Sequence, residues 1–455
     1  MEDVARKIAD TPSNLLSSSI SASRGMVKRV RNQRHLKKAE AYWHTLGPGL
    51  TTGAADDDPS GIATYSQTGA AYGFQLLWLA GFTFPLMSFV QEMCARIGLV
   101  TGRGLAGNIR LHFSRKVLYL CTALLFIANT LNIGADLGAM AEGVQLIFPN
   151  LNFNWIVVGF TVLTLGLQIF TSYEKYAKYL KWLALLLLSY IFSALSVNLD
   201  AKALFQSFVF PSITFSKDQI ILICAILGTT ISPYLFFWQT SQEVEEAILK
   251  GKTTLLLRQN TTKEEVKKMR IDVWSGMFLS NIVMFFIIAA CGVTLFQSGV
   301  TNIATAADAA KALEPFAGKN AYLLFALGII GTGLLAIPVL AGSASYAISE
   351  SLKWKHGLYR TLHEAPSFYG VIIIATLIGL GMNFLHIDPM KALLYSAVAN
   401  GLIAPVILVL IVKISSDKKI MGEKWVNNDV TAAIGWYVTI LMFAAAIAAI
   451  YSLLF

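Results

Sequence analysis

Apolar runs of about 20 residues recur from residue 46 to the end of the chain, and each is long enough to cross a hydrocarbon core of about 30 Å. We count eleven such runs, which begin near residues 46, 74, 117, 153, 177, 218, 271, 320, 366, 390 and 430. The mean hydropathy is +0.59, and only 14% of the 455 residues are charged. Such a composition is too apolar for a water-soluble globular protein. The sequence therefore predicts an all-α, polytopic integral membrane protein and excludes a soluble enzyme.

The basic residues are distributed unevenly between the two sides that these runs define. The net charge is +9, and 31 of the 36 Lys and Arg residues fall in residues 1–45 or in connections on the same side as that tail. Cytoplasmic segments carry such an excess, so we expect a plasma-membrane protein with a cytoplasmic N-terminus and, after an eleventh span in residues 416–455, a C-terminus on the outer side. Residues 1–45 are too long and too charged for a secretory signal, and we expect a loosely ordered basic tail. Binding of nucleic acid is excluded, because no groove-reading helix or aromatic platform accompanies the charge.

Two of the runs are interrupted by helix-breaking residues. The first run contains Asp-Asp-Asp-Pro-Ser-Gly at residues 56–61, and the sixth contains Gly-Thr-Thr-Ile-Ser-Pro-Tyr at residues 228–234. Proline removes a backbone donor and glycine permits strained backbone. Broken helices at matching positions of two halves indicate an inverted-repeat transporter whose substrate site lies where the breaks meet. We expect a LeuT-like 5+5 arrangement with repeats at residues 46–200 and 201–415.

Unwound helices expose carbonyl oxygens, and these attract cations. A carboxylate at that depth costs roughly 2.5 to 3.5 kcal/mol, so it is expected to face an ion, a proton or a partner charge. Asp58 is the strongest candidate ligand. In the alternative interpretation Pro59 only kinks the helix, and the three aspartates lie at its aqueous end. Asp56 and Asp57 either line the mouth of the pathway or cap a half-helix.

The motifs at the two breaks resemble those of the Nramp family of divalent-metal transporters. Residues 58–61 stand where that family has Asp-Pro-Gly-Asn, and residues 228–234 resemble its Gly-Ala-Thr-Ile-Met-Pro-His segment. The resemblance extends over most of the chain, including Asn-Gly at residues 400–401 and Ala-Gly-Ser at residues 341–343. Nramp proteins bind Mn²⁺ and Fe²⁺ through the Asp, the Asn, the Met sulfur and backbone carbonyls. Here Gly61 replaces the Asn and Ser232 replaces the Met, a pattern similar to the Nramp-related magnesium transporters.

The resemblance implies a metal site made of Asp58, the carbonyls of Ala55 and Thr229, and the hydroxyl of Ser232, with Gly61 leaving room. Such a site offers hard oxygen ligands, whereas a thioether selects transition metals. Mg²⁺ also keeps several waters at about 2.0 to 2.1 Å. Asp58 is either an inner-sphere ligand or a hydrogen-bond acceptor for that water.

Proton-coupled Nramp proteins have a His after the proline of the sixth span and an Asp-x-x-Glu patch in the third. Tyr234 replaces the His, and Ala139 stands at the position of the Glu. Asp136 remains, either as a residue of the pathway or as a buried structural partner of Asn132. The double loss leads to the hypothesis that metal entry is not coupled to protons.

Several other polar residues lie in the apolar runs. Asn281 and Asn400 either face the pathway or bond between helices. Glu92 and Arg96 have the i, i+4 spacing of a structural ion pair. Gln239, Gln242, Glu243 and Glu246 form a helical stripe, either an exit vestibule or a solvated helix end.

These features predict a monomeric transporter that imports Mg²⁺, and Mn²⁺ as well, by alternating access through the lipid bilayer, without a cofactor. The alternatives are a proton-coupled Mn²⁺/Fe²⁺ transporter and, more distantly, a sodium-coupled symporter of an organic solute; a channel is a further class. No enzyme is indicated, because Gly-Arg-Gly at residues 102–104 is too short for a phosphate-binding loop and the six histidines lack metal-ligand spacing. The four cysteines lie in apolar runs and are expected to be reduced.

Overall fold

The computed structural model describes residues 47–171, 191–192, 195–196, 201–385 and 387–454. By its internal contacts the chain divides into Met1–Gly47 and Pro48–Phe455, and the description that follows is of the second unit. The basic tail expected at residues 1–45 and the fifth span, expected from residue 177, fall on residues outside the described set.

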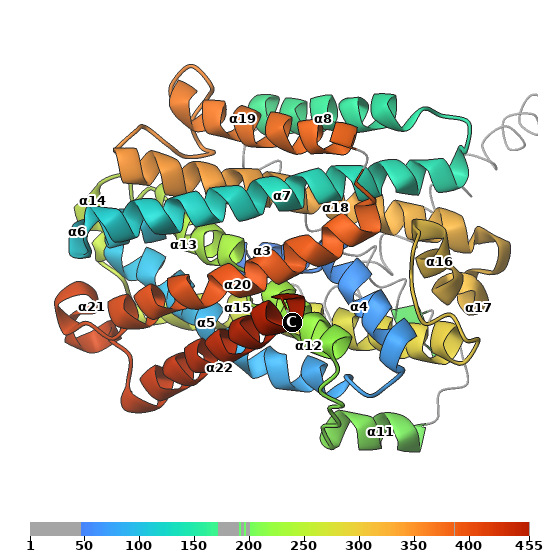
Figure 1. The fold of residues 1–455 in the computed structure, drawn as a ribbon. Helices are drawn as coiled ribbons and strands as arrows, with labels where there is room; N and C mark the ends of the chain where they lie inside the picture. The colour runs from blue at the N-terminus through green and yellow to red at the C-terminus, as the bar shows by residue number, and fades with distance from the viewer. Residues whose placement is uncertain (1–46, 172–190, 193–194, 197–200, 386, 455) are drawn as a thin grey trace, which may run out of the picture. The chain divides into compact units, whose positions relative to one another are not determined.

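The regular elements of the described residues are helices, and these residues form no β-strand (Figure 1). Eight segments of the described chain are long and apolar enough to cross a membrane. They begin close to the predicted positions, and the largest difference is between residue 271 expected and Lys263 observed. The long helices are α5 (Trp78–Thr101), α7 (Arg115–Ile147), α8 (Phe153–Phe170), α15 (Lys263–Cys291) with the π-helix η2 (Gly292–Phe296), α18 (Ala321–Leu352), α19 (Pro366–Met382), α20 (Pro389–Ser415) and α22 (Asp429–Leu454).

The two interrupted runs form pairs of shorter helices, as predicted. The first run gives α3 (Pro48–Asp56) and α4 (Pro59–Tyr72), and the sixth gives α12 (Lys217–Thr230) and α13 (Pro233–Leu249). The remaining short helices are α6 (Leu105–His112), α11 (Ala201–Val209), α14 (Leu255–Gln259), α16 (Ala306–Ala310), η3 (Lys311–Leu313), α17 (Glu314–Ala317), η4 (Gly318–Asn320), η5 (Asn383–Leu385) and α21 (Lys418–Trp425). The architecture is therefore all-α with discontinuous helices at the first and sixth positions.

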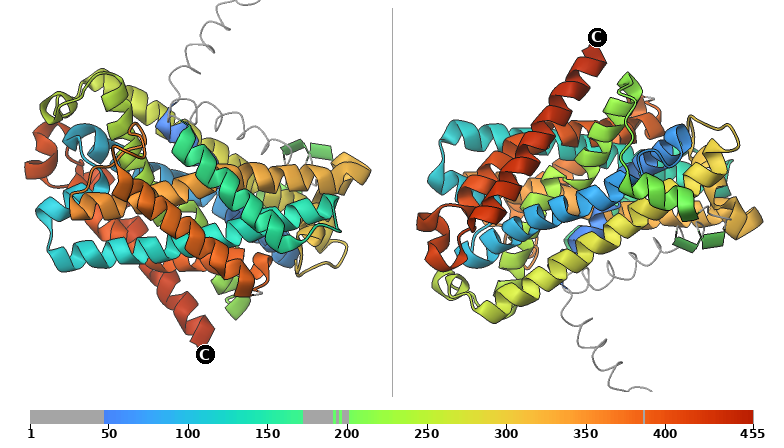
Figure 2. Two further views of the ribbon diagram at one scale, coloured as in Figure 1. Left: turned by 90° about the horizontal axis from the view of Figure 1, so that it is seen from above. Right: turned by 90° about the horizontal axis from the view of Figure 1, so that it is seen from below.

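The continuous helices enclose the broken ones (Figures 1 and 2). Helices α7 and α18 run side by side, and α8 and α19 lie on the outer side of this pair. Helix α3 packs against α15 and α13, α4 packs against α15 and α20, and α12 packs against α20 and α22. The breaks are thus held in the interior of the bundle.

Glycines allow the broken helices to approach their neighbours at backbone distance. A Cβ atom on Gly53 of α3 would lie 2.2 Å from the carbonyl oxygen of Gly276 in α15. A Cβ on Gly228 of α12 would lie 2.4 Å from the backbone nitrogen of Gly401 in α20. Contacts between small residues are a main source of helix association in membranes, where lipid and side chains are equally apolar. The side chain of Asp272 in α15 also accepts hydrogen bonds from the first backbone N–H groups of α3, at Gly49 (2.7 Å) and Leu50 (3.0 Å).

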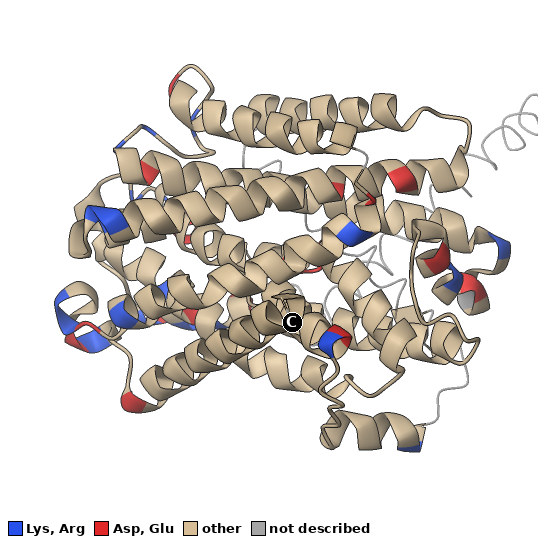
Figure 3. Cartoon of the chain, viewed as in Figure 1, with Lys and Arg blue, Asp and Glu red and all other residues tan. Residues whose placement is uncertain are grey.

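Lys and Arg residues gather at the end of the bundle that carries α6, α14 and α21, which we call the basic end (Figure 3). Glu92 of α5 binds a basic residue there, but not the predicted one. Its Oε1 accepts from Nε (2.9 Å) and Nη2 (2.7 Å) of Arg270 in α15, whereas Arg96 donates to Asn427. The i, i+4 prediction was wrong because residues of α15 serve both oxygens of Glu92: Arg270 donates twice to Oε1, and Trp274 donates to Oε2. The four cysteines are free and buried, as expected.

Candidate metal centre

The first break is a local consequence of the sequence Asp-Pro-Ser-Gly. Asp58 is extended (φ −68°, ψ 173°) and caps α4, where Pro59 occupies the first turn. Its Oδ1 accepts hydrogen bonds from the backbone N–H of Gly61 (2.7 Å) and the hydroxyl of Ser60 (2.6 Å). Aspartate is a favoured N-cap, and proline suits the first helical turn. Of the three aspartates, Asp58 rather than Asp56 or Asp57 is therefore the cap.

The second break has the same form with a different hydrogen-bond pattern. Ser232 precedes Pro233 and is extended (φ −82°, ψ 132°), but its side chain does not cap α13. Its hydroxyl instead turns back to α12, towards the carbonyl oxygens of Gly228 (2.7 Å) and Thr229 (2.6 Å). The hydroxyl thus satisfies acceptors that the end of α12 leaves without helical partners.

The two breaks lie against each other. The hydroxyl of Tyr234 in α13 donates to the carbonyl oxygen of Ala55 in α3, at 2.8 Å. A Cβ atom on Gly61 would lie 3.2 Å from the hydroxyl oxygen of Thr229 and 3.2 Å from the carbonyl oxygen of Asp56. The fold therefore brings together the candidate site residues of two motifs that are far apart in the sequence.

The small residue at position 61 does not leave open space in this conformation. Contacts at 3.2 Å are tighter than most Cβ contacts, so an asparagine here would require Thr229 to move. The sequence predicts room for a hydrated ion, whereas the structure shows α4 closed against α12 at this point.

Helix α7 adds an amide and a second carboxylate to the site. The side-chain nitrogen of Asn132 donates to Oδ2 of Asp58 (2.9 Å) and to Oδ2 of Asp136 (3.2 Å). The expected contact between Asp136 and Asn132 is present, and Asn132 also links Asp136 to the break. Both expected roles of Asp136 are therefore compatible with its position.

Ser280 of α15 is a site residue that the sequence analysis missed. Its hydroxyl lies 2.6 Å from Oδ2 of Asp56 and 3.3 Å from Oδ1 of Asp57. The neighbouring Asn281, which the sequence analysis singled out, instead binds Thr83 (2.9 Å) and the carbonyl of Met277 (2.9 Å). Successive side chains on a helix point about 100° apart. The sequence analysis therefore selected the right part of α15 but the wrong one of two adjacent polar residues.

The carboxylates are buried and short of partners. Asp56, Asp57 and Asp58 have exposed fractions of 0%, 0% and 1%, so the alternative of a triplet at an aqueous helix end is wrong. Within the described part of the chain, Oδ1 of Asp56, Oδ2 of Asp57 and Oδ1 of Asp136 accept no hydrogen bond. No ion pair with Lys, Arg or His involves any of these aspartates among the described residues. Buried charges without a counter-ion are costly, so the site favours a cation.

Asn400 of α20 is fully buried, on a helix that packs against both α4 and α12. Both amide atoms are buried and have no hydrogen-bond partner among the described residues. Its neighbour Gly401 contacts the backbone of α12 at Cys224 and Gly228, just before the second break. An unpaired buried amide is costly, and the missing partner speaks against the alternative of a bond between helices.

The polar stripe of α13 is more buried than a solvated helix end. Gln239, Gln242 and Glu243 have exposed fractions of 5% or less, and Gln239 donates to Glu243 at 2.9 Å. Only Glu246 pairs as a solvated end would, with Lys250 at 3.0 Å. The three buried residues lie between the second break and the basic end.

Oxygen atoms of carboxylates, hydroxyls and backbone carbonyls dominate the centre. No group of three or more His, Cys, Asp or Glu residues in the described ranges is arranged to hold a metal ion. An ion at the breaks would therefore depend on carbonyl and hydroxyl oxygens in addition to carboxylate.

A helical membrane protein in which two discontinuous helices meet at buried carboxylates has the architecture of a LeuT-like transporter. A family model described as natural resistance-associated macrophage protein-like (Nramp) matches residues 49–452. The chain therefore belongs to the Nramp family, whose members are membrane metal transporters and not enzymes.

Several solved structures have a similar fold. A point mutant of the Eremococcus coleocola manganese transporter superimposes with a TM-score of 0.68 at 17% identity, covering 88% of this chain and 84% of that one. The same transporter in complex with an aromatic bis-isothiourea compound gives 0.68 and 17%, with coverages of 91% and 87%. The inward-facing conformation of Mhp1 gives a TM-score of 0.51 at 14% identity, with coverages of 89% and 90%. At these identities the likeness concerns the fold.

Proposed function

We propose that this protein imports Mg²⁺, and Mn²⁺ as well, as partly hydrated ions by alternating access. The observation that carries the proposal is Ser232, whose hydroxyl lies at the second break where the Nramp motif has a methionine sulfur. A site of carboxylate, hydroxyl and carbonyl oxygens has no thioether to select transition metals. Hard oxygen ligands suit Mg²⁺ and still accept Mn²⁺.

Asp58 is the proposed main ligand, directly or through a water molecule. Ala55 and Thr229 supply carbonyl oxygens, each of which also accepts a hydroxyl hydrogen bond in the structure. A carbonyl oxygen has two lone pairs, so these bonds are compatible with an ion or its water. Mg²⁺ dehydrates reluctantly, which favours contacts through water.

The space that a hydrated ion needs at the breaks has to come from movement of the half-helices. The closed contact between Gly61 and Thr229 separates if α12 moves away from α4. Gly61 permits the closed contact, which an asparagine would hinder. Alternating access by rocking of one repeat against the other supplies such a movement.

Metal entry is proposed to follow its own gradient and the membrane potential, without proton coupling. Tyr234 and Ala139 stand where proton-coupled Nramp proteins have titratable side chains, and Tyr234 is engaged with Ala55. A divalent cation moving inward gains about 4.6 kcal/mol per 100 mV, so no second driving ion is required.

The proposed setting is the plasma membrane, with the basic end in the cytoplasm, the N-terminus inside, the C-terminus outside, and a monomer as the functional unit. The gathering of Lys and Arg at one end supports the orientation (Figure 3). The repeats are proposed at residues 46–200 and 201–415.

A cleavable tag after residue 455 should be cut by protease added to intact cells. Cutting only after lysis would show that the C-terminus is cytoplasmic, opposite to the proposed orientation.

The central experiment measures Mg²⁺ and Mn²⁺ uptake into proteoliposomes that contain an internal pH dye. We expect saturable Mg²⁺ uptake without acidification. Ser232→Met should shift preference towards Mn²⁺, whereas Ser232→Ala, which removes the hydroxyl without adding sulfur, should not. Robust acidification during uptake, or Mn²⁺ uptake with no response to Mg²⁺, would favour the proton-coupled alternative.

A further inference from the structure

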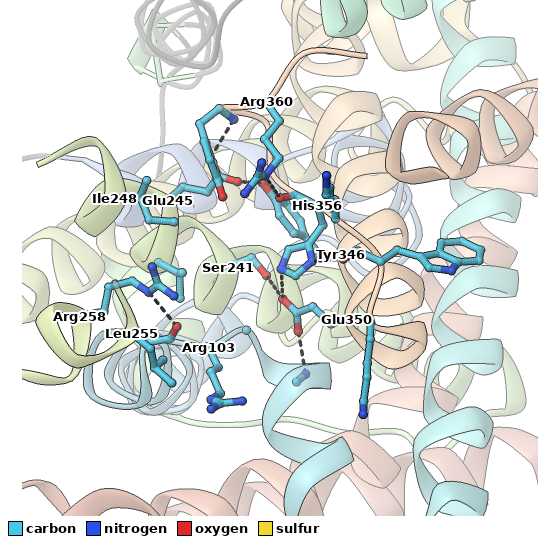
Figure 4. A pocket seen from close by; sticks show the side chains of 18 of the residues that line it. Arg103, Ser241, Glu245, Ile248, Leu255, Arg258, Tyr346, Glu350, His356 and Arg360 are labelled. Atoms are coloured by element: carbon cyan, nitrogen blue, oxygen red, sulfur yellow. Dashed lines mark hydrogen bonds and ion pairs between the residues drawn. The ribbon is translucent and has the colours of Figure 1, made fainter. Parts of the chain in front are cut away.

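A cavity of about 470 Å³ lies at the basic end, and none of the residues that line it belongs to the candidate metal centre. Figure 4 shows the side chains around it. Its walls come from the turn between α5 and α6, the last turns of α13, the connection containing α14, and the segment after α18. These are four separate parts of the chain, so the cavity is a product of the tertiary fold.

The cavity is strongly basic. Two carboxylates, Glu245 and Glu350, face a larger set of cationic side chains that also line it. The Lys and Arg residues of the wall are Arg103, Arg110, Arg258, Lys353, Lys355 and Arg360.

Both carboxylates are already used to build the walls. Glu245 accepts from the hydroxyl of Tyr346 (2.7 Å) and from the backbone N–H groups of Leu358 (2.9 Å) and Tyr359 (3.1 Å). Glu350 accepts from the backbone N–H of Gly107 in the first turn of α6 (2.7 Å). Glu245 thus fixes the segment after α18 to α13, and Glu350 fixes the end of α18 to α6.

Several of the cationic side chains, by contrast, are not used to build the walls. The side chains of Arg103, Lys353 and Lys355 form no hydrogen bond or ion pair with the residues that the structure describes. Arg258 donates only to backbone carbonyls, at Gly102 (3.1 Å) and Thr253 (2.8 Å). Partial burial, and the like charge of Arg103, lower the pKa of Arg258. An anion in the cavity would relieve this repulsion.

We propose that this cavity binds a polyvalent phosphate group. Arginine forks match phosphate oxygens in bidentate geometry, and the lysines add point charges. The volume is in the range of small-molecule sites. Gly-Arg-Gly at residues 102–104 alone predicts no phosphate-binding loop, but here it contributes one wall among four.

A bound polyphosphate would connect parts that must separate during transport. Helix α13 begins at the second break with Ser232 and Tyr234 and ends at this cavity. An anion that holds the last turns of α13 to α6 and to the segment after α18 keeps the basic end closed, and so slows release of metal. This consequence rests on the proposed function, whereas the binding itself does not.

Binding is tested by calorimetry with inorganic pyrophosphate and with ATP, on the full chain in phosphatidylcholine nanodiscs with EDTA present. The chelator removes transported metal, so failure of the transport proposal does not affect the result. The variant R103Q/K355Q should weaken binding at least tenfold with an unchanged melting temperature, because neither side chain has a hydrogen bond or ion pair to lose among the described residues. Lys267→Gln, an exposed lysine of α15 outside the cavity, removes a positive charge and should bind as the parent does.

A second arm distinguishes a soluble phosphate from a lipid headgroup. If pyrophosphate and ATP do not bind, but phosphatidic acid in the nanodisc, whose phosphomonoester can carry two charges, raises the melting temperature of the parent and not of R103Q/K355Q, the phosphate belongs to lipid. Absence of both effects overturns the proposal. Equal binding by the parent and the double variant also overturns it, since the ligand would then lie elsewhere.

Discussion

The hydroxyl of Tyr234 donates a 2.8 Å hydrogen bond to the carbonyl oxygen of Ala55. The bond connects the first turn of α13 to the last turn of α3, and thus joins the two broken helices directly. Both residues are fully buried, with exposed fractions of 0%. Loss of one partner leaves the other unsatisfied, at a cost of about 1–3 kcal/mol. The side chain that stands in place of the Nramp histidine therefore stabilises the closed arrangement of the site.

The substitution Tyr234→His should make transport depend on pH. An imidazole has an ordinary pKa of about 6.5 and gains a positive charge as the pH falls. A cation beside Ala55 repels a divalent ion, so we expect Mg²⁺ uptake of this variant to fall roughly fivefold from pH 7.5 to pH 5.5. Initial uptake rates in proteoliposomes measure this effect. The parent and Tyr234→Phe should give flat profiles over the same range; a flat profile for Tyr234→His would argue against a position beside the ion.

The breaks could be predicted from the sequence because their causes are local. Pro59 and Pro233 occupy the first turns of α4 and α13, and each follows an extended residue, Asp58 or Ser232. Span positions were predictable for a similar reason, since hydropathy depends on residues close in the chain. The family motifs then selected residues that the fold brings together.

Hydrogen bonds and ion pairs between residues far apart in the sequence could not be predicted. The hydrogen bond between Ser280 and Asp56 joins residues 224 positions apart. Spacing along one helix suggested Arg96 for Glu92, although the nearest guanidinium comes from α15. Such choices depend on helix rotation and on which faces meet, and apolar composition all round a membrane helix gives little information about either.

The partner of Glu92 gives a stability prediction. Arg270→Gln removes both guanidinium hydrogen bonds from a carboxylate whose side chain is 7% exposed. We expect the free energy of unfolding to fall by about 1–3 kcal/mol, measured as a lower melting temperature in detergent. Arg96→Gln also removes one positive charge, in this case from α5, but leaves the ion pair between Arg270 and Glu92 intact. It should therefore lower the melting temperature less. An equal or larger loss for Arg96→Gln would restore the i, i+4 pairing.

Asp58 can be tested without disturbing its cap. Asparagine is as good an N-cap as aspartate, so Asp58→Asn can still accept from the N–H of Gly61. The free oxygen of Asn132 allows its amide to turn and accept from the new side chain. We therefore expect near-parental melting but at least about a 100-fold loss of Mg²⁺ and Mn²⁺ uptake, since losing even an outer-shell partner of a metal costs about 10–100-fold.

The matched control for that variant is Asp417→Asn. Asp417 caps α21 through the N–H of Lys419 at 2.7 Å, outside the candidate centre. Its uptake should equal that of the parent. Retention of uptake by Asp58→Asn would remove Asp58 from the role of main ligand, whatever the behaviour of the control.

Ser280 separates a structural role of Asp56 from a role in ion binding. Ser280→Ala removes the hydroxyl that lies 2.6 Å from Oδ2 of this buried carboxylate, which costs about 1.5–3 kcal/mol because the acceptor is charged. We expect a lower melting temperature without metal and its partial recovery in millimolar Mg²⁺, since a cation near Asp56 replaces the lost donor. Ser298→Ala, at an exposed position just after η2 whose hydroxyl donates, among the described residues, only to the carbonyl of Thr294, should melt like the parent in both conditions. If Mg²⁺ gives Ser280→Ala no more stabilisation than it gives the parent, Asp56 serves the fold and lies outside the ion's reach.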